Sequence, residues 1–211
     1  MSETKCPLCA SEAELFHNSE KHRFFSCDSC QGIFRDPRQV LGPQLEKDRY
    51  LLHQNHMQDL GYRNFVAPIL EAVRSNFKAG ASGLDYGCGH TPVISELLKL
   101  EEYKVDAYDP FFFPDRSFED KSYDFIVCCE VMEHFQNPKK EFELLSKLLK
   151  ADGKLICMTS LFSESTDFES WYYKNDPTHV FLYRKETLDF LVKACDFGDV
   201  KIRERLIVFS K

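Results

Sequence analysis

Short apolar or alternating runs and amphipathic stretches follow one another along most of the chain. Such runs are typical of strands buried in a sheet, and four are expected: residues 83–86, 103–109, 123–129 and 154–159. Apolar residues at helical spacing indicate helices, and five are expected: residues 44–57, 62–77, 92–100, 139–150 and 184–195. Residues 200–209 predict one or two further strands at an antiparallel edge. Strands that alternate with helices predict an α/β fold, with a mostly parallel sheet and flanking helices.

Two of these helices carry residues that bear on where they begin and end. Pro68 is expected near the beginning of the helix over residues 62–77. Gly153, in Ala151-Asp152-Gly153, is expected to end the helix over residues 139–150 as a glycine cap.

One strand-to-helix junction is rich in glycine. It reads Asp85-Tyr86-Gly87-Cys88-Gly89, and Pro92 follows in the first turn of the predicted helix. Gly87 and Gly89 leave the backbone bare, so a ligand can approach the strand's carboxyl end and meet free N–H groups at the helix start. Open α/β sheets bind ligands at this place. The third glycine of the dinucleotide fingerprint and the Gly-Lys-Ser/Thr of the triphosphate loop are both absent.

An acidic residue stands about twenty residues after the glycine turn, at the end of the next predicted strand. An acid in this position can accept hydrogen bonds from both hydroxyls of a ribose. Asp109 has the required position, whereas its competitor Asp106 lies within the strand. The sequence therefore favours Asp109.

Four of the nine cysteines form two CxxC pairs near the N-terminus: Cys6, Cys9, Cys27 and Cys30. Each CxxC turn points two sulfurs at one metal, and two turns complete a tetrahedral site for a structural zinc ion. Residues 1–40 are therefore expected to be a zinc ribbon, with a short hairpin between the pairs and with His17 and His22 solvated. Residues 36–43 read as a linker to a second domain over residues 41–211, in which residues 41–80 form a helical cover.

Bulk properties limit the partners. The chain of 211 residues can hold one α/β domain and a small appendage, and its formal net charge of −7 makes nucleic acid an unlikely partner. No apolar stretch is long enough to span a membrane, and residues 1–5 are no signal peptide. The scattered remaining cysteines favour a reducing cytoplasm. The zinc ribbon could recruit a protein partner.

Two segments together carry a resemblance to a known family. Asp85-x-Gly87-x-Gly89 resembles motif I of the class I S-adenosylmethionine (SAM) methyltransferases. The succession of residues 123–127, Glu133-His134 and residues 148–155 resembles the ubiquinone O-methyltransferase type, over roughly residues 62–211. This resemblance implies a Rossmann-like sheet and SAM as cofactor. It also implies cofactor-binding positions: the amino-acid end of SAM at Asp85, Tyr86, Gly87, Cys88 and Gly89, the ribose at Asp109, a further contact from Pro110, and flanking contacts from Cys129 and Glu130.

The chain departs from this family between Asp109 and Tyr123. Only thirteen residues lie between these two positions, too few for the family's third strand and its helix. These two elements are expected to be reduced or missing, together with the usual place for the adenine amino group. Several residues remain open as substitutes: Asp115, Glu119 or Asp120 for the amino group, and Phe111 to Phe113 for the ring.

The resemblance also implies where methyl transfer takes place. Many family members place an Asp-Pro-x-His-Val segment beside the substrate pocket, and here that segment is Asp176 to Val180. His179 is the first candidate for a catalytic base and His134 the second. Further residues are candidates for the lining of the acceptor pocket, with ordinary surface or lid packing as the alternative: Tyr50, His53, His56, Trp171, Tyr172 and Tyr173.

The expected function is SAM-dependent methyl transfer to a small-molecule or modified acceptor, at an oxygen. Two alternatives stay open. The chain is a SAM-binding module that recruits a protein through its zinc ribbon, or it is a divalent-metal-dependent RNA 2′-O-methyltransferase. The second alternative is similar to small-RNA enzymes, with Glu130, Glu133, His134 and His179 as metal ligands.

Overall fold

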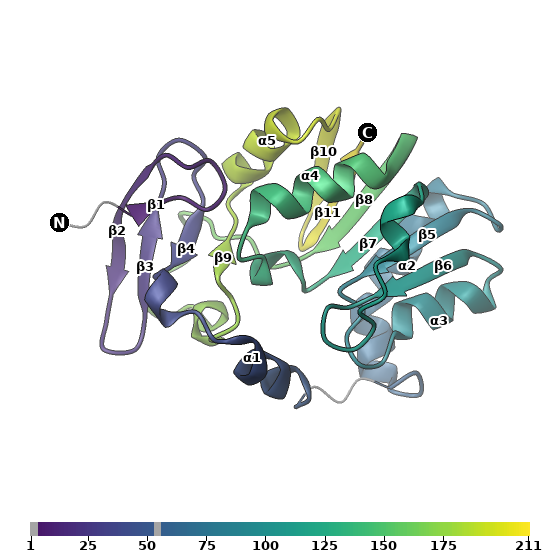
Figure 1. Ribbon diagram of the computed structural model, residues 1–211, viewed down its shortest axis with the longest axis horizontal. Coiled ribbons are helices and arrows are strands. Elements are labelled where there is room, and N and C mark those ends of the chain that lie inside the picture. The colour runs from purple at the N-terminus through teal and green to yellow at the C-terminus, as the bar shows by residue number, and fades with distance from the viewer. Residues whose placement is uncertain (1–3, 53–55) are drawn as a thin grey trace.

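The computed structural model describes residues 4–52 and 56–211, which form two sheets and their covering helices (Figure 1). The larger sheet has the strand order β10-β11-β8-β7-β5-β6. Its strands are β5 (Ser82–Tyr86), β6 (Lys104–Tyr108), β7 (Tyr123–Cys129), β8 (Leu149–Met158), β10 (Asp199–Arg203) and β11 (Leu206–Ser210). The four strands β6, β5, β7 and β8 are parallel, while β11 and β10 are antiparallel at one edge. The predicted α/β fold is confirmed.

Helices cover both faces of this sheet because alternate residues of a strand point to opposite faces. Phe125 and Val127 of β7 pack in one apolar cluster with α2 (Leu60–Asn76) and α3 (Val93–Leu100). Ile126 and Cys128 pack in the other with α4 (Pro138–Leu148) and α5 (Lys185–Ala194). The strand is therefore buried on both faces, as its continuous apolar run predicts.

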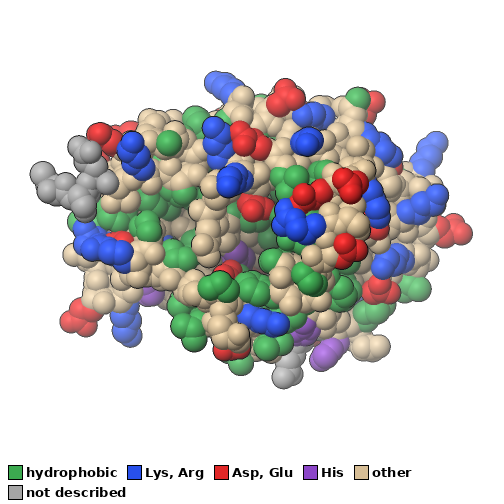
Figure 2. All heavy atoms as spheres, in the orientation of Figure 1, with side chains coloured by type: hydrophobic (Ala, Val, Ile, Leu, Met, Phe, Trp, Pro, Cys, Tyr) green, Lys and Arg blue, Asp and Glu red, His purple; other side chains and the backbone are tan. Residues whose placement is uncertain are grey.

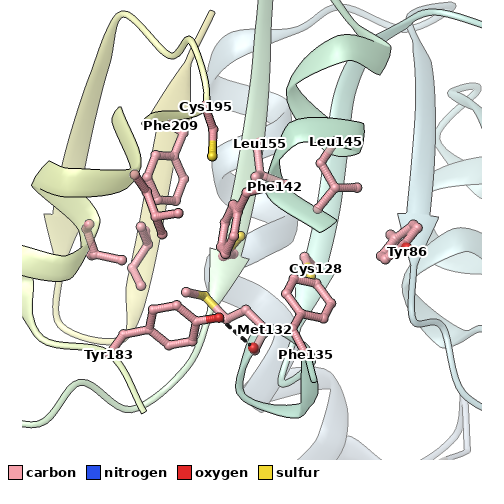
Figure 3. Packing of buried hydrophobic residues seen from close by; sticks show 14 of the residues in the cluster. Tyr86, Cys128, Met132, Phe135, Phe142, Leu145, Leu155, Tyr183, Cys195 and Phe209 are labelled. Carbon is pink, nitrogen blue, oxygen red and sulfur yellow. Dashed lines mark hydrogen bonds between the residues drawn. The ribbon is translucent and has the colours of Figure 1, made fainter. Parts of the chain in front are cut away.

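Figure 3 shows the second of these clusters from close by. Phe142 and Leu145 of α4 point toward Leu155 and Phe209 of the sheet. Tyr183 is fully buried beside them, and its hydroxyl donates a hydrogen bond of 2.8 Å to the carbonyl oxygen of Met132. This bond fixes the loop after β7, where several candidate site residues lie.

Strand β6 is the other edge of the larger sheet. In the part of the chain that the structure describes, no strand pairs with its outer side. Residues 110–122 instead form a loop with an isolated bridge from Asp109 to Phe113 and the 3₁₀ turn η2 (Ser117–Asp120). The predicted reduction of the third strand and its helix is confirmed.

Two predicted helix details are wrong. Gly153 does not cap α4, because the helix ends at Leu148 and the chain becomes extended at Leu149, which pairs with Tyr123. Pro68 lies well inside α2 because Asp59 caps the N–H groups of Gly61 and Tyr62, so the helix starts two residues earlier than predicted.

Helix α1 (Pro43–Tyr50) is shorter than the helix predicted over residues 44–57. His53, one of the candidates for the acceptor pocket, lies outside the described residues. No helix of the described chain has the length and apolar character needed to cross a membrane.

The second sheet is antiparallel and has the order β1-β2-β3-β4-β9. Its strands are β1 (Thr4–Lys5), β2 (Glu12–Asn18), β3 (Arg23–Ser26), β4 (Ile33–Arg35) and β9 (Phe181–Leu182), and the 3₁₀ turn η1 (Pro37–Gln39) follows β4. Strands β2 and β3 form the predicted hairpin. Strand β9 comes from the C-terminal part of the chain, and Figure 1 shows it beside β4. The N-terminal residues and the larger domain thus share one sheet.

The expectation that His17 is solvated is wrong. Its side chain is only 11% exposed, and its Nδ1 lies 3.3 Å from the carboxylate of Glu169. His17 is half-buried because Phe24 and Phe168 pack beside its ring. His22 is half-buried, with its Nδ1 3.3 Å from Nη1 of Arg35.

Candidate active site

A cavity of about 1100 Å³ opens at the carboxyl ends of β5, β6 and β7. Its wall includes the glycine turn, the tips of β6 and β7, and two 3₁₀ turns, η3 (Met132–His134) and η4 (Tyr172–Asn175). Most predicted site residues line it: Tyr86, Gly87, Cys88, Gly89, Asp109, Pro110, Cys129, Glu130, His134 and His179. The structure thus brings the predicted cofactor residues and the two histidines to one space.

The glycine turn has the backbone shape that only glycine adopts easily. Gly87 and Gly89 have φ of +79° and +68°. A side chain at Gly87 would begin 2.6 Å from the methyl groups of Val131, whereas one at Gly89 would meet no described atom within 4 Å. Gly87 therefore permits close packing against the loop after β7, and Gly89 leaves its part of the cavity open.

The three central N–H groups of this turn, which precede the helix start, are all bonded within the chain. The N–H groups of Gly87 and Cys88 donate to the carbonyl oxygen of Tyr108, at 2.8 and 3.1 Å. The N–H of Gly89 donates to Oδ2 of Asp109 at 3.0 Å. These bonds tie the turn to the end of β6, because parallel strands end at the same edge of the sheet.

Asp85 is the one predicted cofactor residue that does not line the cavity. Its side chain is buried, and its Oδ2 accepts hydrogen bonds from the main-chain N–H and the hydroxyl of Ser95, at 3.1 and 2.7 Å. Burial raises the pKa of this carboxyl to about 6. Through these bonds Asp85 joins β5 to α3, the two elements that the glycine turn connects.

Asp109 lies at the tip of β6 and faces the cavity. Besides the bond from Gly89, its Oδ1 accepts from the N–H groups of Phe111 and Phe112, at 2.9 and 3.1 Å. A carboxylate offers about four acceptor sites, so a ligand hydroxyl can still bind. Asp106, the competitor, does not line the cavity; it accepts from the hydroxyl of Tyr123.

The loop after β6 supplies further cavity wall. Phe111 and Arg116 line the cavity. Of the acidic candidates, Asp115 accepts from the N–H of Ser117, and Glu119 pairs with Arg116. Among the residues that the sequence offered as contacts for adenine, Phe111 therefore lines the cavity and the others do not.

Two glutamates and a tyrosine form a buried cluster beside the cavity. The hydroxyl of Tyr173 lies between them, bonded to Oε1 of Glu133 and 3.2 Å from Oε2 of Glu130. Glu133 is fully buried, and its Oε2 has no hydrogen-bond partner among the described residues. Burial raises the pKa of Glu133 to about 7, and burial followed by repulsion from Glu133 raises the pKa of Glu130 to about 7. Arg205 pairs with Glu130 at 2.5 Å.

His134 and His179 lie next to this cluster, with ring centroids 4.9 Å apart. Nδ1 of His134 is 2.9 Å from the carbonyl oxygen of Thr178, and Nδ1 of His179 is 2.7 Å from that of Tyr173. A carbonyl oxygen only accepts, so each Nδ1 carries the proton and each Nε2 keeps its lone pair. Burial lowers the pKa of both histidines, that of His179 to about 3 with a further contribution from His134. Both rings are neutral at pH 7.

A carboxylate oxygen of Glu133 and a ring nitrogen of each histidine lie within 4.8 Å of one another. One unpartnered carboxylate oxygen and two oriented imidazoles are a donor set that a divalent cation accepts. Glu130 is not part of this group.

The four N-terminal cysteines also converge. Sγ of Cys6 lies 3.5 Å from Sγ of Cys30, Cys9 and Cys27 are 3.4 Å apart, and all four sulfurs lie within 4.8 Å of one another. Tetrahedral zinc with bonds of about 2.3 Å separates its sulfurs by roughly 3.8 Å. The four thiolates therefore fit a zinc ion.

The remaining candidates for the acceptor side divide. Tyr50, Tyr172 and Tyr173 line the cavity, and the ring of Tyr50 meets that of His134 edge-on at 5.4 Å. Trp171 packs against Phe162 and Phe168 instead, and His56 is exposed. The lining residues that the sequence missed include Tyr62, Phe65, Glu141 and Arg205. A helix that covers a motif I turn is a signal for the first two. Arg205 lies in the tight turn between two strands and carries no such signal.

Comparison with known proteins agrees with this geometry. Residues 53–202 match a family described as "Methyltransferase domain". A search of curated proteins found no relative. A SAM-dependent methyltransferase from Archaeoglobus fulgidus has a similar structure, with 20% identity, a TM-score of 0.53 and coverage of 71% of this chain and 94% of that one.

Two further solved structures are similar at low identity. One is the magnesium protoporphyrin IX methyltransferase of Synechocystis, with 11% identity, a TM-score of 0.52 and coverage of 80% of this chain and 94% of that one. The other is an O-methyltransferase family protein from Burkholderia thailandensis, with 13% identity and a TM-score of 0.51. The match to the latter covers 69% of this chain and 55% of that one, so this chain spans little more than half of that protein's length. These likenesses support the fold.

Proposed function

The chain belongs to the methyltransferase domain family and is a SAM-dependent methyltransferase; we propose that it methylates an oxygen atom of a small-molecule acceptor. The observation that carries the proposal is the shared cavity. The glycine turn and Asp109 form one part of its wall, and His134 and His179 form another.

In this proposal, SAM lies along the glycine turn. Gly87, Cys88 and Gly89 border its amino-acid end, Asp109 accepts from the ribose hydroxyls, and Glu130 flanks the sulfonium. Methyl transfer is a single displacement at the sulfonium carbon, so the protein's main task is to align the acceptor oxygen, the carbon and the sulfur. SAM, when bound, supplies the activated methyl group.

His179 is the proposed base for the acceptor hydroxyl, and His134 is the second choice. The carbonyl oxygen of Tyr173 holds Nδ1 of His179, which leaves Nε2 free to accept a proton. His179 is a weak base in its buried position, but the neighbouring carboxylate of Glu133 would stabilise the imidazolium that forms.

Cys6, Cys9, Cys27 and Cys30 are the proposed ligands of a structural zinc ion. All four positions are protein-filled, so zinc would act as a crosslink and leave no site for a substrate. The nine reduced thiols favour a cytoplasmic location.

A second candidate adds a divalent cation at Glu133, His134 and His179. The unpartnered Oε2 of Glu133 and the convergence of the three donors favour it. When bound, such an ion would bind the acceptor oxygen and lower its pKa. Lysines, arginines and acidic residues are interspersed on the face that Figure 2 shows, and the net charge is −7. These charges favour a small acceptor over RNA.

Calorimetry and turnover test the main proposal together. The chain should bind SAM and its demethylated product, and Asp109→Ala should abolish both bindings. With methyl-labelled SAM and a metabolite extract, His179→Ala should retain SAM affinity and lose most label transfer. Absence of SAM binding would refute the assignment of the cavity, and unchanged transfer by His179→Ala would refute the base.

The same assay separates the alternatives. Binding of SAM without transfer to any extract component would favour a binding module that acts through a partner. Transfer that requires added magnesium or manganese, in protein that retains its zinc, would favour the second candidate.

A further inference from the structure

Arg35, the last residue of β4, is a buried cation that does not line the cavity. Its side chain is 3% exposed. Nε donates to the carbonyl oxygen of His179 at 3.1 Å, and Nη2 donates to those of Lys174 and Asp176, each at 2.9 Å. Three main-chain carbonyls of the segment that carries His179 thus converge on one guanidinium.

The surroundings keep this side chain charged and in place. Burial lowers the pKa of Arg35 to about 10, so the group is still protonated at pH 7. Its guanidinium lies over the ring of Phe24, 4.7 Å from the centroid. A buried charge is costly unless its donors are satisfied. Here three main-chain carbonyl oxygens accept from Nε and Nη2, and Nδ1 of His22 lies 3.3 Å from Nη1.

The main chain of Arg35 holds the same segment. Its N–H donates to the carbonyl oxygen of Val180 at 2.9 Å, next to the pairing of β4 with β9. His179 is therefore held at its carbonyl by Arg35, at its N–H by the carbonyl of Asp176 at 3.2 Å, and at Nδ1 by the carbonyl of Tyr173.

We propose that Arg35 is a positioning residue for His179: it gathers the carbonyls of residues 174–179 and so keeps the Nε2 of His179 turned toward the cavity. The inference rests on the proposed role of His179. It means that the four-cysteine sheet contributes to methyl transfer through Arg35, although the sheet itself lies outside the cavity.

A simpler role for Arg35 would be to hold the two parts of the chain together. Arg184 has that role and gives a matched control. Its Nη1 donates to the hydroxyl of Ser26 at 3.2 Å and to the carbonyl oxygen of Gln31 at 2.8 Å, across the same interface. Arg184 touches neither His179 nor its segment in any of these bonds.

The test follows the imidazole of His179 in the full, zinc-loaded chain labelled with ¹⁵N-histidine, which requires no acceptor. In the unmodified chain, His179 should show one fixed tautomer, protonated at Nδ1. Arg35→Gln should shift its two ring nitrogens toward a mixture of tautomers and accelerate amide exchange at residues 178–182 at least about tenfold. Arg184→Gln should leave the His179 signals unchanged.

Arg35→Lys is the second variant, in case Arg35→Gln does not fold. It keeps the charge, but one ammonium cannot span three carbonyls as the guanidinium fork does. We expect the same shift of His179, smaller in size. Wild-type His179 signals in Arg35→Lys, or equal shifts in Arg184→Gln, would overturn the proposal.

Calorimetry with SAM separates this inference from the proposed function. SAM affinity should remain within twofold in both Arg35 variants, because the glycine turn and Asp109 do not contact Arg35. If the unmodified chain failed to bind SAM, the proposed function would fail, while the response of His179 to Arg35 would still be measured.

Discussion

At the scale of one residue, Glu133 is a carboxyl that is buried at a cost in stability. A fully buried carboxyl with one unpartnered oxygen among the described residues is unfavourable in its charged form. A fold selected for stability alone would place a neutral group there. Buried carboxyls with raised pKa values are typical of functional sites.

Glu133→Gln should therefore stabilise the protein, depending on pH. The folded-state pKa of about 7 lies above the unfolded value, so the wild-type carboxyl adds stability that is fully present below about pH 4 and is lost as the pH rises through 7. A glutamine does not titrate, so its contribution to stability does not change over this pH range. Urea unfolding of the metal-free site should show a gain on the order of 1–3 kcal/mol at pH 8 and a smaller gain at pH 5.

Glu101→Gln is the matched control. Arg74 lowers the pKa of the Glu101 carboxyl through two hydrogen bonds, so the charged form is the stable one there. This variant should lose stability at pH 8. If Glu133→Gln also lost stability at pH 8, the Glu133 carboxylate would be paired in solution. If added manganese stabilised the wild-type chain enough to reverse the gain of the variant, that would support the metal candidate.

Gly87 makes a second prediction at this scale. Gly87→Ala must accept a φ of +79° and bring its methyl group 2.6 Å from Val131. The conformation alone costs about 1–2 kcal/mol, and the clash adds to it, so we expect a loss of roughly 2–4 kcal/mol in urea unfolding and at least tenfold weaker SAM binding by calorimetry.

Gly80 provides a control for the cost of the positive φ alone, without the clash. It has a φ of +88°, but a side chain there meets no described atom within 4 Å, and it lies outside the cavity. Gly80→Ala should lose about 1 kcal/mol and keep SAM affinity. Equal losses in the two variants would argue against close packing of Val131 on the turn.

At the scale of elements, features that follow from the number of residues available could be predicted from the sequence. Features that depend on pairing between distant segments could not. Thirteen residues between Asp109 and Tyr123 cannot hold a helix and a strand, so the edge position of β6 could be predicted. The end of α4 could not, because it depends on Leu149 pairing with Tyr123 on the neighbouring strand. The hydrogen bonds of the turn after β5 could not be predicted either, because its N–H groups donate to the carbonyl oxygen of Tyr108 at the end of β6.

Four of the five strands of the N-terminal sheet have only two to four residues, so the cysteine cluster should carry much of the sheet's stability. Cys9 is the least buried of the four proposed zinc ligands, and Cys9→Ser changes little else. Metal analysis should find one zinc per wild-type chain and none in the variant, and amides of β2 and β3 should exchange much faster because zinc binding supplies folding free energy.

Cys88→Ser should keep one zinc per chain, since Cys88 lies in the glycine turn, away from the cluster. Zinc lost from both variants would point to a general thiol effect. Retention of tightly bound zinc by Cys9→Ser, with unchanged exchange, would contradict a four-thiolate site.

At the scale of the whole molecule, the sequence did not allow us to predict that two distant segments share one sheet. The pattern predicts separate units over residues 1–40 and 41–211, whereas strand β9 pairs with β4 across about 150 positions of the chain. A two-residue strand such as β9 has no periodicity to reveal it. Arg35 was missed for the same reason, since the three carbonyl oxygens that its side chain binds all lie beyond residue 170.

This sharing predicts that the zinc-loaded chain unfolds in one step. The cysteine cluster, Phe34 and Phe181 belong to the same buried core as α4 and α5, so neither part exposes its core without the other. The single tryptophan, Trp171, packs beside the N-terminal sheet, while far-UV circular dichroism follows the whole chain. Urea curves from the two probes should coincide, as two-state unfolding requires.

Phe181→Ala should separate the two curves. Phe181 is fully buried in β9, and its ring lies over Gly32, where a side chain would begin 2.3 Å from it. Its loss costs about 3–5 kcal/mol and acts on the contact between the two parts. Phe197→Ala removes a similar volume beside Phe209 of β11, outside the pairing of β4 with β9, and should lower the midpoint while the curves still coincide. Separate curves in the wild-type chain would show that the two parts fold independently, and the zinc-bearing sheet would then influence His179 only through the hydrogen bonds of Arg35.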